Sequence, residues 1–326
     1  MLRALLVLVL LAVGTISRAE SPPLTIETKI PLGNVLGRID HLAIDLARER
    51  LYVAELGNDS VGVIDLRQQK VIQRLTGLRE PQGIGYSLAA DTVYVATGGD
   101  GAIHAFKGPE LNAAGVITLG GDADNVRVDD TMQRVVVGYG NGALAIVDTT
   151  TLRKMGDVQL KGHPESFQLD TIHHRIFANV PDAHVITVVD SHELRTKAFW
   201  STKDMASNYP LALDSDTQRV LAVFRRPAAL GVFDMKDGTR VATVPTCGDA
   251  DDVFFDSKRS LVYVSCGDGM VDVIRANANT YTSIAHVATG AGARTSLFVP
   301  ELERLYVAVR AGGGESAAIW VLRPSP

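Results

Sequence analysis

Short runs of apolar residues recur along the chain at a nearly constant interval. Each run ends at an anchor residue, and a pair of strand-forming residues follows seven positions later, as Tyr52-Val53 follows Asp45. The anchors are Asp45, Ser87, Asp129, Asp170, Asp214, Asp256 and Pro300, the last with its pair one residue sooner. Successive anchors are separated by 42, 42, 41, 44, 42 and 44 residues, which defines seven repeat units.

Each unit contains four short segments of strand character. Val, Ile, Phe and Tyr dominate the first three, and examples of the third are Val-Gly-Val-Ile-Asp65 and Val-Ile-Thr-Val-Val-Asp190. The fourth is more polar, such as Lys-Val-Ile-Gln-Arg-Leu75, and clusters of Gly, Asn and Asp separate the segments where hairpins turn. Four strands in a unit of about forty residues are typical of a β-propeller blade.

The two ends of the chain complement each other. The last unit has only three strands, ending at Ala-Ala-Ile-Trp-Val-Leu322, whereas residues Leu24 to Ile30 form an alternating strand with no partner of its own. Placing that strand in the last blade removes two exposed sheet edges. The sequence therefore predicts an all-β fold: a seven-bladed β-propeller with four-stranded blades, closed by the N-terminal strand in the last blade.

Four of the strand pairs carry a common motif, namely Leu51-Tyr-Val-Ala54, Val93-Tyr-Val-Ala96, Val262-Tyr-Val-Ser265 and Leu305-Tyr-Val-Ala308. With these motifs the chain resembles the YVTN-repeat β-propellers of the YncE-like kind, over essentially its whole length after residue 19. The resemblance implies an exported seven-bladed propeller. It implies no single activity, because the motif reports strand packing and one fold hosts many functions.

The first 19 residues have the pattern of a signal peptide. Arg3 precedes an unbroken apolar run from Ala4 to Val13, and Ser17-Arg18-Ala19 offers small residues for cleavage. That run is well short of the roughly twenty residues of a membrane-spanning helix, so no membrane span is expected. We therefore expect a signal peptide over residues 1–19, a single propeller domain over residues 20–326, and a periplasmic or secreted protein.

The net charge and the cysteine content limit the classes of binding partner and predict one covalent link. The chain has 32 Lys and Arg against 37 Asp and Glu, a net charge of -5, which argues against a nucleic-acid partner. The only cysteines are Cys247 and Cys266. An even count in an exported protein favours a disulfide, and a hairpin between the two brings them to one end. We predict a Cys247–Cys266 bond and a monomer.

The candidate site lies where the repeats differ. The innermost strand of a propeller blade begins beside the central channel, so the residues that precede each inner run surround one mouth of that channel. Most are polar and several are acidic, which a purely packing role would not favour. The predicted ligand-binding residues are Asp40, His41, Gln82, Asp124, Asn125, Glu165, Asn208, Tyr209, Arg225, Arg226, Asp251, Asp252 and Arg294.

Two acidic stretches, Gly121–Val126 and Gly248–Val253, fall in blades three and six and should face each other across the channel. Clustered carboxylates repel unless a positive group neutralises them, and that group is either a divalent cation or an arginine such as Arg225, Arg226 or Arg294. Alternatively, the aspartates cap turns. The candidate metal ligands are Asp124, Asn125, Glu165, Asn208 and Asp251.

The sequence thus predicts a protein that binds a small polar ligand, a cation or a protein partner at an acidic channel mouth. The Gly-x-Ser-x-Gly, phosphate-loop and His-Glu-x-x-His signatures are absent, which favours binding over catalysis. Two enzyme classes stay open as alternatives: a metal-dependent hydrolase of the lactonase type, and a quinoprotein-like oxidoreductase.

Overall fold

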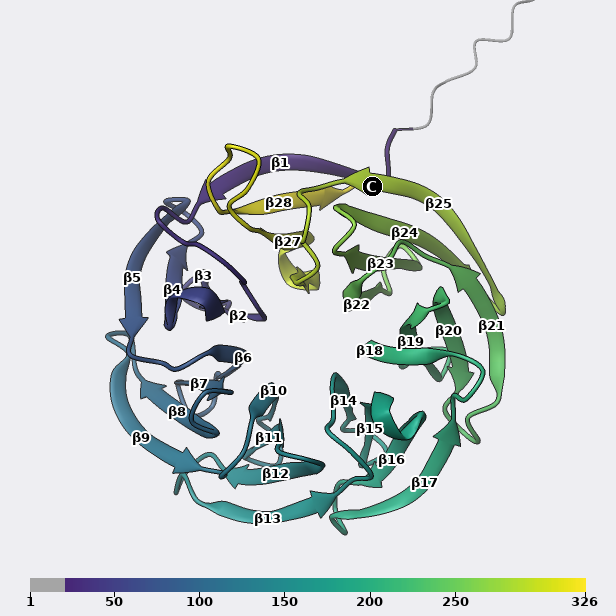
Figure 1. Cartoon of the computed structure of the whole chain (residues 1–326), viewed down its shortest axis with the longest axis horizontal. Helices are drawn as coiled ribbons and strands as arrows, with labels where there is room; N and C mark the ends of the chain where they lie inside the picture. The colour runs from purple at the N-terminus through teal and green to yellow at the C-terminus, as the bar shows by residue number, and fades with distance from the viewer. Residues whose placement is uncertain (1–20) are drawn as a thin grey trace, which may run out of the picture.

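The computed structural model describes residues 21–326, so the expected signal peptide lies outside the described residues. Seven four-stranded antiparallel sheets are arranged radially around a central channel (Figure 1). This confirms the predicted seven-bladed propeller. Blade one comprises β2 to β5, later blades follow in chain order, and blade seven combines β26, β27 and β28 with β1.

The strands occupy four concentric positions. The innermost are β2 (Leu42–Asp45), β6 (Pro81–Ser87), β10 (Ala123–Asp129), β14 (Phe167–Asp170), β18 (Ala206–Asp214), β22 (Ala250–Asp256) and β26 (Ser296–Val299). The second are β3 (Arg50–Glu55), β7 (Thr92–Thr97), β11 (Arg134–Tyr139), β15 (Arg175–Val180), β19 (Arg219–Arg226), β23 (Leu261–Cys266) and β27 (Arg304–Val309). The third are β4 (Ser60–Asp65), β8 (Ala102–Lys107), β12 (Ala143–Asp148), β16 (Val185–Asp190), β20 (Ala228–Asp234), β24 (Met270–Asn277) and β28 (Ala318–Pro324). The outermost are β5 (Lys70–Thr76), β9 (Asn112–Thr118), β13 (Lys154–Gln159), β17 (Arg195–Ser201), β21 (Arg240–Pro245), β25 (Thr280–Ala288) and β1 (Leu24–Pro31).

The anchor residues shape the turn that follows each innermost strand. In the first six units the anchor side chain accepts a hydrogen bond from the backbone N–H three residues later, as Asp45 Oδ1 does from Arg48 at 3.0 Å. In the seventh, Pro300 begins a short 3₁₀ turn, η3 (Pro300–Leu302). Asp and Ser favour such turns because a short polar side chain can bond the nearby backbone. The repeat in the sequence is therefore largely a repeat of one turn.

The hydrophobic core is divided among the interfaces between blades. The buried apolar residues of the described chain form seven clusters, and each joins two neighbouring blades. Tyr52, Tyr94 and Tyr263 of the Tyr-Val motifs are at most 1% exposed. Tyr263 also donates a hydrogen bond to the anchor Asp256 at 2.8 Å. The motif thus fixes the packing of one blade on the next.

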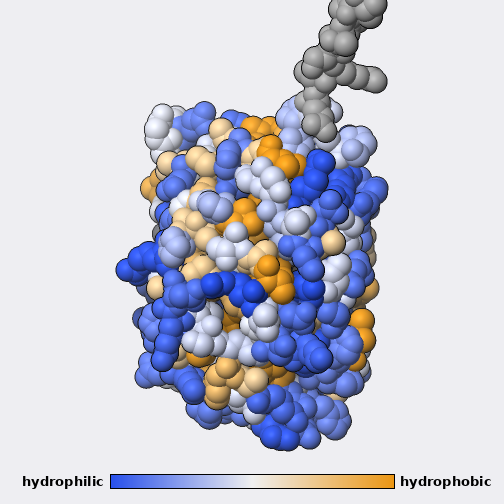
Figure 2. Space-filling model, turned by 90° about the vertical axis from the view of Figure 1, so that its right-hand side faces the viewer, coloured by the Kyte–Doolittle hydropathy of each residue, from blue (hydrophilic) through white to orange (hydrophobic). Residues whose placement is uncertain are grey.

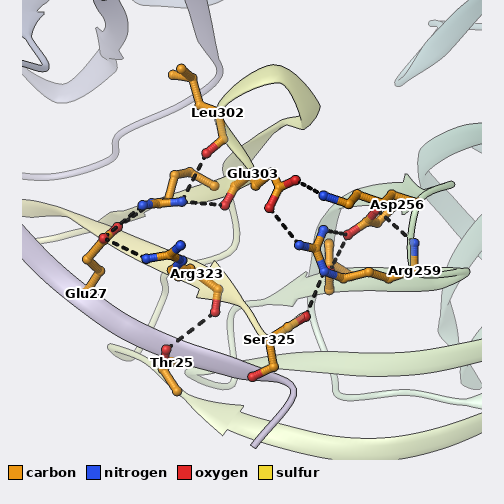
Figure 3. Close-up of polar contacts among 11 residues, drawn as sticks. Thr25, Glu27, Asp256, Arg259, Leu302, Glu303, Arg323 and Ser325 are labelled. Carbon is orange, nitrogen blue, oxygen red and sulfur yellow. Dashed lines mark hydrogen bonds and ion pairs between the residues drawn. The ribbon is translucent and has the colours of Figure 1, made fainter.

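Blade seven is closed as predicted. β1 pairs antiparallel with β28 from Leu24 opposite Pro324 to Pro31 opposite Ala318, and Leu24 and Ile30 are buried. Ion pairs reinforce this closure (Figure 3). Within blade seven, Arg304 of β27 pairs with Glu27 of β1. Between blades six and seven, the Arg259 guanidinium contacts Glu303 at 2.8 Å. Arg259 also donates to the Ser325 carbonyl at 2.7 Å.

The outer surface carries apolar side chains singly rather than as one patch. Six outermost strands each expose one of them: Ile26, Ile72, Val116, Met155, Phe199 and Ile284. In the edge-on view, apolar residues are interspersed with polar ones (Figure 2). Isolated apolar side chains on a surface are ordinary. Within residues 21–326, no helix is long and apolar enough to cross a membrane.

Candidate functional site

The innermost strands all begin at one end of the channel, which we call the mouth. Asp40 and Glu165 lie in the loops just before β2 and β14, and Asp124 and Asp251 lie at the starts of β10 and β22. These two strands stand on opposite sides of the channel (Figure 1). Gly83 lets blades two and three approach closely, since a Cβ there would lie 2.1 Å from the Asp124 carbonyl oxygen. The fold therefore gathers the acidic side chains around the channel axis.

His41 directly precedes β2 and lines the channel. Its Nδ1 is 3.7 Å from Asp252 Oδ1, and its Nε2 is 3.9 Å from Asp40 Oδ1. Burial by itself lowers the pKa of an imidazole, but the charges of Asp252, Asp40 and Asp124 outweigh it and raise the pKa of His41 to about 10. His41 is therefore a cation at neutral pH.

A protonated His41 donates from both ring nitrogens. Asn125 lies beside it, with the two side-chain nitrogens, Nδ2 of Asn125 and Nε2 of His41, 3.2 Å apart, while Asn125 Oδ1 is buried without a donor. Turning the amide over brings Oδ1 to the imidazolium and satisfies both groups. We therefore assign Asn125 as an acceptor for His41.

Blade six uses arginines to neutralise its acidic stretch. The two oxygens of Asp251 contact Arg225 Nη2 at 2.8 Å and Arg294 Nε at 2.9 Å. Asp249 bridges the same two guanidinium groups, at 3.1 Å from Arg225 and 2.8 Å from Arg294. The Arg225 guanidinium lies 3.9 Å above the ring of Tyr209, a cation–π contact. The sequence analysis expected either a divalent cation or an arginine to neutralise these carboxylates, and in blade six arginines do so.

The opposite side of the mouth has no such neutralisation. Glu165 makes no ion pair within residues 21–326, and burial together with the nearby Asp251 raises its pKa to about 7. Burial and the Asp40 charge also raise the pKa of Asp124, although His41 opposes the shift. Even Asp251 has its pKa raised to about 6, because burial outweighs its two arginines. These carboxyl groups hold protons at pH values where exposed ones are ionised.

Several acceptor atoms around the axis lack donors. Within the described residues, Asp124 Oδ1 and both carboxylate oxygens of Asp40 are buried without a hydrogen-bond partner. Arg38 Nη2 lies 2.9 Å from Asp40 Oδ2, close enough for an ion pair but not aligned for a hydrogen bond. Buried polar atoms without partners are uncommon and call for an explanation.

Four predicted site residues lie apart from this cluster or at its border. Asn208 is fully buried and donates to Asn179 Oδ1 and the Val185 carbonyl, which hold it against the neighbouring blade four. Arg226 is exposed and reaches Ser207 Oγ at 3.1 Å. Gln82 donates to the Asp122 side chain in an exposed hydrogen bond. Asp252 accepts from the Ser296 N–H, and its other oxygen faces His41.

The predicted metal ligands do not converge as a cation site. Among residues 21–326, no group of three or more His, Cys, Asp or Glu side chains is placed to hold a metal ion. Both oxygens of Asp251 already face guanidinium groups, which stand where a cation would have to bind. The side chains present therefore do not fit the proposed ligand set.

Three charged residues of the mouth were missed by the sequence analysis. Arg38 pairs with Asp40, and Asp249 completes the arginine network. Arg310 is close enough to Arg294 and Arg38 that, with burial, their charges lower its pKa. Asp249 could have been found, because it belongs to the stretch already singled out. Arg38 and Arg310 lie outside the aligned positions, so the repeat gave no signal for them.

The predicted disulfide is confirmed and supports the site. Cys247 and Cys266 are bonded, with Cα atoms 5.9 Å apart. The bond ties the loop before β22 to the end of β23, next to Asp249 and Asp251. The Cys247 N–H also donates to Asp272 at 2.7 Å. The loop that carries the arginine-binding carboxylates is thereby held at its base.

Comparison with known proteins identifies the fold. No family model matches the chain. No curated protein matches it either. Among solved structures, a chain of the Kuenenia stuttgartiensis hydrazine synthase is 14% identical with a TM-score of 0.78, covering 90% of this chain and 98% of that one. A chain in the crystal structure of the mitotic checkpoint complex is 13% identical with a TM-score of 0.80, covering 99% of each. At these identities the similarity supports the seven-bladed propeller alone.

Proposed function

We propose that this protein is a binding protein whose ligand is a small polar molecule with cationic or hydrogen-bond-donating groups, held at the channel mouth. The propeller fold suits binding in general, since its loops converge on one concave face. We further propose that the chain is an exported, monomeric propeller of the YVTN-repeat kind, with a signal peptide over residues 1–19 and one domain over residues 20–326.

The observation that carries the proposal is the set of buried acceptors without donors. Asp40 and Asp124 are 0% and 8% exposed, and three of their four carboxylate oxygens are fully buried without a hydrogen-bond partner within residues 21–326. Leaving a buried acceptor unpaired costs about 1–3 kcal/mol, more for a charged group. A ligand that donates hydrogen bonds or brings positive charge recovers that cost, and the raised pKa of Glu165 provides a further carboxyl group for it.

The same arrangement also selects against anions on that side of the mouth. Asp124 and Glu165 face the axis without arginine partners, whereas Asp251 is shielded by Arg225 and Arg294. A ligand amine would therefore lie toward blades three and four. Binding should strengthen between pH 6 and pH 8, because the carboxyl groups release their protons in that range and the charged form attracts a cation.

The test is a thermal melt at pH 8 with putrescine as a diamine probe and Ca²⁺ as a metal probe. We expect putrescine to raise the melting temperature of the parent, and of the control variant Glu303→Gln at the blade-seven rim. The double variant Asp124→Asn, Glu165→Gln should fold and lose that response. If putrescine does not shift the parent, if Ca²⁺ shifts it as much as putrescine does, or if the double variant responds to putrescine as the parent does, the proposal fails.

A further inference from the structure

Beyond His41, toward the ends of the innermost strands, the channel contains a cavity. It has a volume of about 370 Å³, within the range of small-molecule sites. Its apolar lining includes Ile44, Val128, Leu211, Phe254 and Leu297, which come from blades one, three, five, six and seven. The cavity therefore suits a compact apolar body, unlike the charged mouth.

One arginine enters this apolar lining. Arg127, on β10, donates from Nη1 to the Val126 carbonyl at 2.8 Å and from Nε to Gln168 Oε1 at 3.4 Å. Gln168 is itself held by a bond to the Leu211 carbonyl at 3.0 Å. Within residues 21–326, Nη2 of Arg127 makes no hydrogen bond, and it is not sealed from the cavity. The guanidinium thus has a free donor and a fixed orientation.

Arg127 also lacks a counter-ion. No carboxylate oxygen of the described chain lies within 4.0 Å of its nitrogens, whereas Arg175, Arg259 and Arg294 all have one. The other charged groups lining the cavity, His41 and Asp252, face each other at 3.7 Å. Arg127 therefore has no direct ion pair, although its guanidinium carbon lies 5.6 Å from the centre of the Phe167 ring and the more distant Asp252 and Asp124 favour its charged form. Burial outweighs these charges and lowers the pKa of Arg127, because the charged form is costly there.

From the free guanidinium donor and the apolar walls, we infer that this cavity is a second ligand site, for a small carboxylate with an apolar body. The carboxylate binds Arg127 and the body packs against Phe254, Leu297 and Ile44. A carboxylate is the natural partner of a guanidinium because its two oxygens match the fork. This inference does not depend on the proposed ligand of the mouth, which has the opposite charge.

The experiment measures hexanoate binding by calorimetry and by thermal melts, with hexanol and inorganic phosphate as the uncharged and non-apolar probes. We expect hexanoate to bind the parent and to bind Arg127→Met at least tenfold more weakly, since a charge-assisted hydrogen bond is lost. Arg127→Met should also melt higher than the parent without ligand, because an unpaired buried charge is removed. The matched control is Arg134→Met on β11, whose guanidinium makes one side-chain hydrogen bond within the described residues, to the Ser191 carbonyl at 2.9 Å, and it should bind hexanoate as the parent does.

Two further variants test the inference if Arg127→Met does not fold and separate this site from the mouth. If Arg127→Met does not fold, Arg127→Lys preserves the charge without the fork and should still lose about tenfold in affinity. The double variant Asp124→Asn, Glu165→Gln should bind hexanoate unchanged, which separates this site from the mouth. The inference is overturned if hexanoate does not bind the parent, if Arg127 variants bind it equally well, or if hexanol or phosphate binds as tightly.

Discussion

At the rim of blade seven, the Glu303 carboxylate contacts Lys258 and lies 2.8 Å from Arg259, and these bonds lower its pKa to about 2 (Figure 3). At the channel mouth, Glu165 has no such partner within the described residues, and burial raises its pKa to about 7. The two glutamates differ only in their surroundings. The blade that closes the ring pairs its charges, and the channel leaves some of its own unpaired.

This contrast separates the residues that hold the ring closed from the residues that the channel mouth offers to a ligand. The closure of blade seven joins the two ends of the described chain and must resist opening, so paired charges and buried side chains stabilise it. Unpaired buried carboxyl groups work against folding, and proteins tolerate them mainly at functional sites. The predictions that follow alter one region while using the other as the reference.

Removing β1 should have the largest effect. Deleting residues 24–31 takes away the buried Leu24 and Ile30 and exposes an edge of blade seven, so we expect loss of cooperative thermal unfolding and aggregation. Circular dichroism melts and size-exclusion chromatography measure this. Ile26→Ala, at a position of the same strand that is 44% exposed, is the control and should melt like the parent. Cooperative melting of the deletion at the parent's temperature would show that closure is unimportant.

Removing the disulfide should be the next largest. The bond joins residues 19 positions apart, and a loop of that size is expected to contribute about 3 kcal/mol through the unfolded chain. We expect Cys247→Ala, Cys266→Ala to lower the free energy of unfolding in urea by about that amount. It should also weaken putrescine binding more than Ile26→Ala does, because the loop before β22 loses its tether. Equal stability of variant and parent would contradict this account.

Neutralising each glutamate should shift stability in opposite directions. The pKa of Glu165 is raised in the folded protein, so its contribution to stability is complete below its ordinary value of 4.5 and is lost as pH rises through about 7. Glu165→Gln should therefore be more stable than the parent at pH 8, by about 1–3 kcal/mol. Urea unfolding at pH 5 and pH 8 measures the change, and a variant less stable at pH 8 would refute it.

Glu303 provides the matched case, with a smaller effect. Its pKa is lowered, so its contribution to stability is present above 4.5 and is lost as pH falls through about 2. Glu303→Gln should therefore be slightly less stable than the parent at pH 8, and the difference should disappear in strong acid and shrink in high salt. If Glu303→Gln instead gains stability at pH 8, the rim charges are not paired as described.

The sequence was informative where structure repeats and less so where side chains meet across the channel. The anchors identified the blades because the first six cap the same turn, and the count of strands identified the closure. Asn208 aligned with the other mouth residues, yet β18 begins early at Ala206, with Ser207 at a φ of 60°. The Asn208 side chain bonds to Asn179 and Val185 of blade four. Arg127 interrupted an apolar inner strand, a visible signal that the sequence analysis passed over. Contacts between blades depend on blade rotation and rotamers, which a linear repeat does not encode.

The most direct test of the unpaired channel is the titration of individual glutamate side chains by carbon NMR in the ligand-free protein. We expect Glu165 to titrate near pH 7 and Glu303 near pH 2, on either side of the ordinary value of 4.5. Glu165→Gln and Glu303→Gln assign the two resonances. If Glu165 instead titrates at or below 4.5, its charge is already compensated within the fold and the channel mouth offers no vacant carboxylate to a ligand.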